Sequence, residues 1–419
     1  MTRVAVVGSG ISGIACADAL SGVADVTLIE AAARLGGHTD THELSIDGVA
    51  MSIDSGFIVF NRRNYPMFSN WLDTHRVASR TTDMSFSASH RGSGLEYGTD
   101  RVGALLAQPV NAVRPRFLRM LADIRRFYRD ASALAPADAE LTVAEFVARR
   151  GYGPGFFEDH LLPICAALWS QPAQQVRSIA IGHVVAFMDN HGMLSLTDRP
   201  EWRVIEGGSQ RYLDAFARRF RSPVLTSLPV RGVHRVSGAV ELETDTGPLH
   251  FDAVVLACHS DQALALLRQP TPAEQRVLGA IRYQPNRVLV HTDDSVMPRR
   301  RAAWSSWNAF VDADPAAPCT VTYWMNRLQR IVTPRPVFVS LNPGARVRQS
   351  CVLAARDYAH PIFDRAALAA QRELPDLQGI GGVYFAGAWA GFGFHEDGFV
   401  SGQRAAAALL SDLRRHRAA

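Results

Sequence analysis

The residues of this chain best suited to acid–base chemistry are two histidines that stand beside glycines near opposite ends of the sequence. His38 follows Gly36 and Gly37, and His395 lies in the glycine-rich run 391–398. A neutral imidazole can accept a proton from carbon, donate a hydrogen bond to a bound ring or cap a turn, and these roles stay open for both residues. Because no Cys-X-X-Cys spacing accompanies them, we expect no metal site.

The first elements of the chain are predicted to be a strand, a turn and a helix, and they lie upstream of His38. Residues 4–7 have the apolar composition of a buried parallel strand, and residues 14–20 predict a helix. The turn between them, GSGISG, permits a tight bend at Gly8, close approach to a pyrophosphate at Gly10 and close helix packing at Gly13. The N-terminus of the helix, with Ser12, directs free N–H groups at the phosphates.

A second strand completes this dinucleotide motif. Residues 26–29 are apolar and end in Glu30, which is placed to accept hydrogen bonds from an adenosine ribose. A GxGxxG motif that follows a strand, opens a helix and is completed by an acidic strand end predicts dinucleotide binding strongly. No second GxGxxG occurs in the sequence, so we expect no separate NAD(P)H-binding domain.

The residues after Glu30 narrow the choice of dinucleotide. Arg34, Gly36, Gly37 and His38 follow it in one stretch. This arrangement resembles the extended N-terminal motif of FAD-binding oxidoreductases of the flavin amine oxidase and phytoene desaturase type. The resemblance implies that the arginine and the glycine pair lie along the FAD diphosphate, and that His38 belongs to the cofactor site.

A second signature of that family lies near the C-terminus. Residues 383–389 predict a strand that leaves into a turn, and residues 391–398 lead into a helix predicted from about Phe399. The resemblance implies that this helix aims its N-terminus at the pyrimidine side of the flavin, where its positive end favours the negative charge of reduced flavin. The cofactor-binding residues implied here are Gly387, His395, Glu396, Asp397 and Gly398.

Two central segments extend the resemblance. Residues 230–233 resemble the strand whose backbone brackets the adenine, which adds Val233 to the cofactor site, and residues 254–258 resemble a later strand of the same domain. The implied fold class is α/β, a discontinuous Rossmann-type FAD-binding domain with a mixed α+β substrate domain. We assign residues 1–80, 200–262 and 372–419 to the first domain, and residues 81–199 and 263–371 to the second.

Length and composition exclude several classes of protein. A chain of 419 residues has room for two domains, and 47% hydrophobic with 20% charged residues is typical of a soluble protein. The net charge of +4 is too small to suggest a nucleic-acid partner. No apolar run is long enough to span a membrane, and the chain enters the nucleotide motif at once, so we expect a cytoplasmic protein without a cleaved signal. Scattered cysteines agree with a reducing compartment: Cys16, Cys165, Cys258, Cys319 and Cys351.

Residues 112–131 predict a helix with an apolar stripe and several arginines. The stripe consists of Phe117, Leu121, Ile124 and Tyr128, and the other faces carry Arg116, Arg119, Arg125, Arg126 and Arg129. Such a helix either packs on a core with solvated arginines or lies on an anionic membrane surface, and residues 409–417 present the same choice on a smaller scale. Peripheral contact with the inner face of the membrane therefore stays open.

Further segments are similar to one bacterial subgroup, known as predicted NAD/FAD-binding or amine-oxidase-like proteins. They are residues 36–39, 54–61, 83–87, 258–264 and 323–326. Members of the subgroup tend to accompany lipid-modifying enzymes such as cyclopropane fatty acid synthases, and some resemble a desaturase of methylated fatty acyl chains. The resemblance implies an FAD-dependent oxidoreductase that transfers hydride from a methylated or unsaturated fatty acyl substrate to flavin N5, with a lipid methyltransferase as a candidate partner.

Two other functions stay open. One is a flavin amine oxidase that acts on a small amine. Many amine oxidases use a lysine to hold a water near flavin N5. This chain contains no lysine, since all 44 residues counted as lysine or arginine are arginines, and this absence counts against the function. The other is an FAD-stabilised, non-catalytic partner of a lipid methyltransferase.

The leading function needs an acid–base group as well as the flavin. A desaturation requires a base beside the flavin, and His395 and His38 are the candidates, as they are for covalent flavin attachment. His183 and His191 are predicted to be structural. Four further residues either line a pocket or belong to the core: Tyr97, Asn308, Tyr323 and Trp324.

Overall fold

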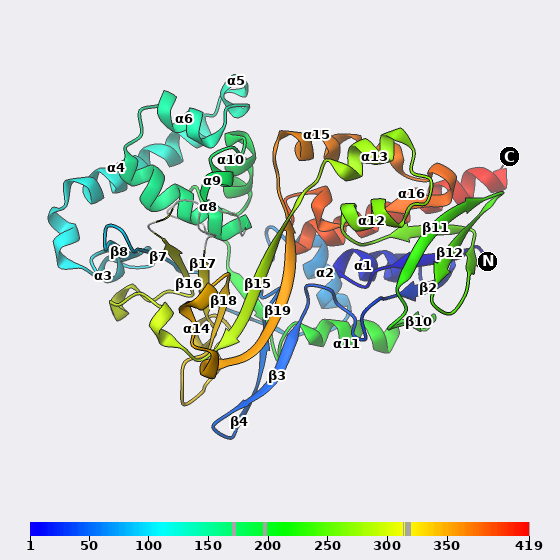
Figure 1. Cartoon of the computed structure of the whole chain (residues 1–419), viewed down its shortest axis with the longest axis horizontal. Helices are drawn as coiled ribbons and strands as arrows, with labels where there is room; N and C mark the ends of the chain where they lie inside the picture. Colours follow the sequence, from blue (N-terminus) through cyan, green and yellow to red (C-terminus); the bar gives the residue numbers. More distant parts are fainter. Residues whose placement is uncertain (170–172, 196–198, 313, 315–319, 419) are drawn as a thin grey trace.

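The computed structural model describes residues 1–169, 173–195, 199–312, 314 and 320–418, and a parallel sheet of five strands organises one half of it (Figure 1). In spatial order the strands are Val224–Leu225 (β10), Asp25–Ile29 (β2), Arg3–Val7 (β1), Ala253–Leu256 (β14) and Val383–Phe385 (β20). Val4 and Val6 of β1 pack into one hydrophobic cluster, and Ala5 and Val7 into another. The strand is therefore buried on both faces, which confirms the predicted α/β, Rossmann-type fold.

Helices and a small sheet cover the two faces of this parallel sheet. On one face α1 (Ile11–Leu20) packs against α16 (His395–Ala418), beside α2 (Pro66–Thr74) and α11 (Gln210–Arg219). On the other face lie α12 (Ser260–Leu266), α13 (Pro272–Gly279), α15 (Arg365–Glu373) and an antiparallel sheet of β11 (Val230–Val236), β12 (Ala239–Thr244) and β13 (Leu249–Phe251).

Helix α16 begins at His395, four residues before the predicted start at Phe399. The carboxylate of Asp397 accepts a hydrogen bond from the backbone N–H of Phe394 at 2.9 Å, and Gly398 N–H donates to the carbonyl of Phe394 at 3.1 Å. These two bonds close a first turn that the glycine-rich sequence does not suggest. His395, Glu396 and Asp397 therefore belong to the helix itself.

A seven-stranded sheet organises the other half of the molecule. In spatial order it consists of Val352–Pro361 (β19), Tyr283–His291 (β15), Phe338–Leu341 (β18), Thr320–Trp324 (β17), Trp307–Val311 (β16), Phe86–His90 (β7) and Glu96–Gly98 (β8). Strands β16 and β7 pair in parallel, and the other neighbours pair antiparallel. The alternating residues 82–90, the turn at residues 92–94 and the return at residues 95–97 predict a hairpin, which is confirmed as β7 and β8. The long strands β15 and β19 lie between the two halves (Figure 1).

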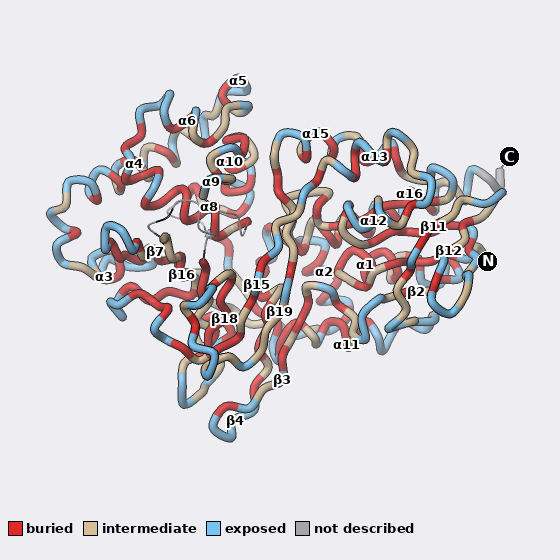
Figure 2. The backbone as a smooth tube through the Cα atoms, viewed as in Figure 1, coloured by how far each residue is buried: buried red, intermediate tan, exposed pale blue. Residues whose placement is uncertain are grey.

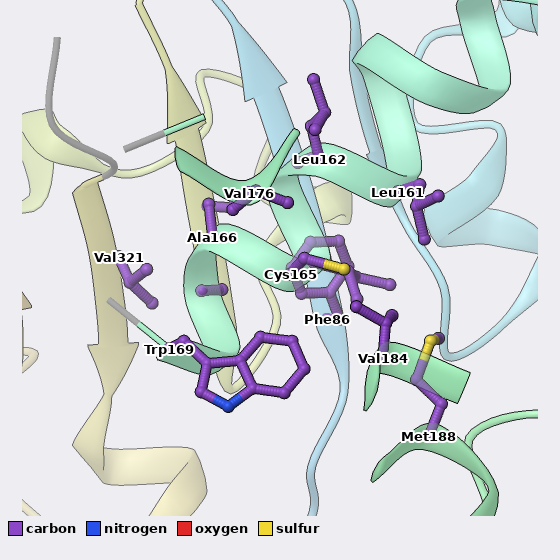
Figure 3. Packing of buried hydrophobic residues seen from close by; sticks show 14 of the residues in the cluster. Phe86, Leu161, Leu162, Cys165, Ala166, Trp169, Val176, Val184, Met188 and Val321 are labelled. Carbon is purple, nitrogen blue, oxygen red and sulfur yellow. The ribbon is translucent and has the colours of Figure 1, made fainter. Parts of the chain in front are cut away.

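Helices pack on this second sheet through a large apolar cluster. They include α4 (Pro115–Ser132), α6 (Val143–Arg149), α8 (Leu162–Trp169) and α10 (Ile181–Asn190). Figure 3 shows the buried side chains of α8 among those of α10 and the sheet, with the thiol of Cys165 inside the cluster. Cys319 lies outside the described residues.

The sequence of residues 156–192 predicts one long helical stretch, and this prediction is wrong. The chain forms α7 (Pro154–Phe156), a π-turn (Phe157–Leu161), α8, α9 (Ala173–Val176) and α10. Between α9 and α10 the backbone turns because Val143 N–H donates to Ile179 O, and Ile181 N–H donates to Leu141 O, both at 2.8 Å. These long-range bonds fix a bend that hydrophobic periodicity does not reveal.

Shorter elements complete the fold. They are the hairpin of β3 (Thr41–Ile46) and β4 (Val49–Asp54), the sheet of β5 (Val59–Asn61), β9 (Trp202–Ile205) and β6 (Ser79–Thr81), and the helices α3 (Val102–Leu105), α5 (Pro136–Ala139) and α14 (Met325–Leu328). Among the described residues, no helix is both long enough and apolar enough to cross a membrane. The predicted residue ranges of the two domains stay a prediction.

Candidate active site

One cavity of about 820 Å³ is lined by elements of both halves. At one end its wall is the β1–α1 turn, the end of β2 and residues 36–38. At the other end the wall comes from α8, α10 and the seven-stranded sheet. A bound molecule can therefore contact both halves at once.

The β1–α1 turn leaves room for a ligand where a side chain would otherwise stand. A Cβ at Gly8 would lie 2.5 Å from the carbonyl oxygen of Ala257, and one at Gly13 would lie 1.8 Å from that of Gly8. A Cβ at Gly10, in contrast, would meet no described atom within 4 Å. No side chain of the described residues caps α1, so its first N–H groups and the open space before Gly10 suit an anionic diphosphate.

Glu30 lies at the rim of the same end of the cavity. Its carboxylate accepts hydrogen bonds from the backbone N–H groups of Ser9 and Ala32, both at 2.9 Å, and from the Ser9 hydroxyl at 2.5 Å. A carboxylate has about four lone-pair positions, so the group is held in place and retains accepting capacity for a ribose hydroxyl. This placement agrees with the predicted role.

Arg34 binds its own loop and does not line the cavity. Its guanidinium donates to the carbonyls of Thr39 at 2.9 Å and Gly37 at 2.8 Å, and lies 3.4 Å from the Asp40 carboxylate. These bonds hold the tight path of the glycine pair, in which Gly36 has a φ of 114°. Arg34 therefore stabilises the loop that carries His38 and does not contact the cavity itself.

Glu396 and Asp397 fix the starts of two helices. The Glu396 carboxylate accepts hydrogen bonds from the backbone N–H groups of Met67 and Phe68, in the first turn of α2, both at 2.9 Å. Asp397 closes the first turn of α16, and its burial raises its pKa to about 6. Both carboxylates therefore stabilise the walls and stand behind the surface of the cavity.

The predicted site residues divide into two groups by their place in the structure. Those that line the cavity are Gly8, Gly10, Ser12, Glu30, Gly36, Gly37, His38, Gly387 and His395. Those that support it from behind are Gly13, Arg34, Val233, Glu396, Asp397 and Gly398. Val230, three residues before the predicted Val233, provides the contact of β11 with the cavity.

His38 lies in an aromatic cluster at the middle of the cavity. Its ring stacks on Tyr358 at a centroid distance of 4.7 Å and lies 5.4 Å from His360 and 6.0 Å from His259. Its Nε2 is buried and has no hydrogen-bond partner among the described residues. Burial and the neighbouring imidazoles hold the pKa of His38 well below its usual value, so the ring is neutral near pH 7.

His395 is held more firmly. Its Nε2 shares a 3.0 Å hydrogen bond with the hydroxyl of Tyr212, which in turn hydrogen-bonds Thr39. Its ring lies nearly parallel to that of Phe57, with centroids 3.7 Å apart. Burial lowers the pKa of His395 to about 3. The imidazole is therefore neutral, fixed in orientation and already bonded at Nε2.

The aromatic cluster around His38 is not predicted by the sequence. Its other members are His259 after β14, Tyr283 at the start of β15, and Tyr358 and His360 on β19. Tyr358 and His360 are two residues apart on a strand and therefore share a face, which is the one local signal that the sequence offered. Their approach to His38 depends on the long-range placement of β19.

The far end of the cavity is apolar and aromatic. Its lining includes Phe86, Ile164, Leu168, Trp169, Phe187, Met188, Leu341 and Phe363. Among the described lining residues the one carboxylate, Glu30, stands at the opposite end, and the one arginine is Arg199. Arg199 is exposed, and its Nε–H donates to the carbonyl oxygen of Ser195 at 3.0 Å. Its positive charge lies close enough to interact electrostatically with the hydroxyl of Tyr128.

The other histidines and aromatic candidates have separate places. Tyr323 lines the cavity, whereas Tyr97, Asn308 and Trp324 do not, and the Tyr97 hydroxyl donates to the carbonyl of Asp159 at 2.8 Å. His191 also lines the cavity. Its Nδ1 bonds the carbonyl of Phe187 at 2.9 Å at the end of α10, and its ring stacks on Phe187. His183 packs its ring near Trp169, Phe363 and Phe392, behind the wall.

A family model described as flavin containing amine oxidoreductase matches residues 11–326. The chain belongs to this family. It is thus an FAD-dependent oxidoreductase, as the two glycine-rich signatures predict, and the site fits the cofactor because open space at Gly10 meets the uncapped N-terminus of α1. No curated protein sequence matches the chain.

Solved structures share the fold at low sequence identity. The CLA-producing fatty acid isomerase from P. acnes is 14% identical with a TM-score of 0.69, over 96% of this chain and 97% of that one. Putrescine oxidase bound to putrescine is 16% identical with a TM-score of 0.69, over 98% and 99%. Cyclohexylamine oxidase from Brevibacterium oxydans IH-35A is 18% identical with a TM-score of 0.68, over 99% of both chains.

Replacing Gly10 tests the cofactor end of the cavity. In Gly10→Val the new side chain meets no described protein atom within 4 Å at Cβ but occupies the space before α1. We expect at least a tenfold weaker retention of FAD, measured by flavin absorbance after desalting, with the free energy of unfolding of the apoprotein changed by less than about 1 kcal/mol. Gly103→Val, at a glycine of α3 with equally open surroundings, is the matched control. Full FAD retention in Gly10→Val would place the diphosphate elsewhere.

The depressed pKa of His395 makes a testable contribution to acid sensitivity. Because its pKa lies near 3 in the folded chain and near 6.5 when unfolded, the unfolded chain binds the extra proton between these values. The free energy of unfolding therefore falls as the pH drops from 6.5 toward 3. In His395→Phe the free energy of unfolding should change less steeply with pH between 4.5 and 6.5, by up to about 1.4 kcal/mol per pH unit.

Thermal unfolding across that pH range is the measurement. Tyr212→Phe removes the hydrogen bond to His395 but keeps the titrating ring, so this control should retain the slope of the wild type. An unchanged slope in His395→Phe would contradict the assignment of a buried, neutral imidazole.

Proposed function

We propose that this FAD-dependent oxidoreductase removes hydride from a lipid-like substrate, a methylated or unsaturated fatty acyl chain that lies in the apolar end of the cavity. One observation carries the proposal. The wall of that end is apolar and aromatic, and its single formal charge among the described lining residues is the cation Arg199. A fatty acyl anion matches both features at once.

The charge distribution weighs against a small cationic amine. An ammonium group taken out of water requires a carboxylate or other acceptors nearby, because burial of an unpaired charge costs several kcal/mol. The carboxylate that lines the cavity, Glu30, is bonded to Ser9 and Ala32 at the opposite end. A hydrocarbon chain, in contrast, gains about 0.8 kcal/mol for each buried CH₂.

An amine oxidase remains the second candidate because one observation favours it. Aromatic rings stand around His38, including Tyr283 and Tyr358, and the face of an aromatic ring attracts an ammonium group. Putrescine oxidase and cyclohexylamine oxidase share the fold. The absence of lysine from the chain still counts against this candidate.

The roles of the chain's own residues follow from the geometry. FAD, when bound, supplies the hydride acceptor. Desaturation also releases a proton from the adjacent carbon, and the buried, unpartnered Nε2 of His38 is our candidate to accept it. His395 is better suited to positioning, because its Nε2 is bonded to Tyr212 and its ring is stacked on Phe57. The aromatic walls exclude water from both. The lipid methyltransferase partner stays a prediction.

Anaerobic flavin reduction separates the two candidates. We expect long-chain methylated or unsaturated fatty acyl lipids to bleach the flavin absorbance of the holoenzyme, with a rate at low concentration that rises about fourfold per added CH₂ until the cavity is full. A panel of monoamines and polyamines, assayed in air for hydrogen peroxide, should give no signal. Peroxide from an amine and no bleaching by any lipid would reverse the assignment.

Replacement of Arg199 tests the anionic end of the substrate. Arg199→Glu should raise KM for a fatty acyl anion at least about tenfold and change kcat less than about twofold, because an ion pair with the headgroup is equally strong in the bound substrate and in the transition state. Arg372→Glu, at an exposed arginine of α15 that does not line the cavity, should leave both constants unchanged. A fall in kcat with an unchanged KM would contradict a role in binding the headgroup.

A further inference from the structure

An unusual number of exposed apolar side chains gather at one end of the molecule. They are Val102 (70% exposed), Leu106, Val110, Val113 (73% exposed) and Leu118, from α3, the turn before α4, and the start of α4. We call this set the apolar corner. It lies at the end farthest from β2 and the N-terminus in Figure 1, and Figure 2 shows exposed residues along it. Single exposed apolar residues are ordinary, but a cluster of five within 17 residues indicates a binding surface.

The apolar corner is distinct from the apolar stripe predicted for the same helix. Phe117 of that stripe is buried, and Leu121, Ile124 and Tyr128 pack against the core of the second half. The stripe therefore faces inward. Leu118 stands on the outward face of α4, seven residues before Arg125, so these two side chains project from the same side of the helix.

Positive charge surrounds the apolar corner. Residues 99–132 contain seven arginines and three aspartates, a net charge of +4, which equals the net charge of the whole chain. Arg119 and Arg126 pair with Asp123, and Arg116 pairs with Asp159. Arg114 and Arg125 have no carboxylate partner among the described residues. Exposed valines and leucines beside two arginines without a carboxylate partner complement the surface of an anionic bilayer.

We propose that the apolar corner docks the protein on an anionic lipid bilayer, with the side chains of Val102, Val110 and Val113 at the level of the acyl chains and Arg114 and Arg125 among the headgroups. The cavity reaches this part of the molecule, since Tyr128 of α4 and Thr99, three residues before Val102, both line it. Docking would bring the cavity close to the lipid. The proposal concerns the surface and stands whether or not a fatty acyl chain is the substrate.

Vesicle sedimentation of the FAD-loaded full chain tests this surface. We expect binding to vesicles of phosphatidylcholine and phosphatidylglycerol in equal parts, and weaker binding to phosphatidylcholine alone or at high salt. The double variant Val102→Asp with Val113→Asp should bind the anionic vesicles about tenfold more weakly. Because both sites are exposed, the variant should keep its FAD content and thermal stability.

A matched control lies at the other end of the molecule. Val23→Asp introduces a charge at another exposed valine (51% exposed), two residues before β2, and should bind vesicles like the wild type. Equal binding by the wild type and the double variant would overturn the proposal, as would no binding of the wild type to anionic vesicles. A wild-type dimer that the double variant converts to a monomer, measured by light scattering, would instead assign the surface to a second copy of the chain and overturn the lipid proposal.

Discussion

The close packing of helices α1 and α16 is the constraint on which the rest of the structure depends. A Cβ at Gly402 would lie 2.1 Å from the carbonyl of Ser12, and one at Gly398 would lie 2.7 Å from the side chain of Ile11. Without side chains at these two positions, both helices can bring their N-termini to the same cavity. The uncapped N-terminus of α1 favours a ligand that carries negative charge, and FAD is the cofactor of this family.

The part of the site that local chemistry determines was predictable from the sequence. Gly8, Gly10, Gly13 and Glu30 lie within one strand–turn–helix–strand unit, so their spacing alone fixes their mutual placement. The start of α16 was predicted four residues late because a carboxylate closes its first turn among glycines. The resemblance also implies Arg34 at the diphosphate, whereas its guanidinium here donates to carbonyls of its own loop, an interaction that no spacing reveals.

The parts assembled from distant segments could not be predicted in the same way. The cluster around His38 requires β14, β15 and β19 to meet residue 38, and their pairing is a property of the whole fold. Likewise, the stripe on α4 predicted an apolar face correctly but could not say that this face packs inward. The outward apolar corner does not follow helical periodicity, because four of its five residues precede α4. Sequence thus predicts the cofactor better than the substrate.

We propose that one cavity holds FAD at the end formed by α1 and an acyl chain at the end that reaches Arg199. A crystal structure of the FAD-loaded protein with a bound long-chain fatty acid tests it most directly. We expect that the diphosphate lies before Gly10, that the chain lies against Trp169 and Phe363, and that the carboxylate lies within hydrogen-bond distance of Arg199. A chain bound outside this cavity, or a carboxylate at the His38 cluster with its tail toward solvent, would contradict it.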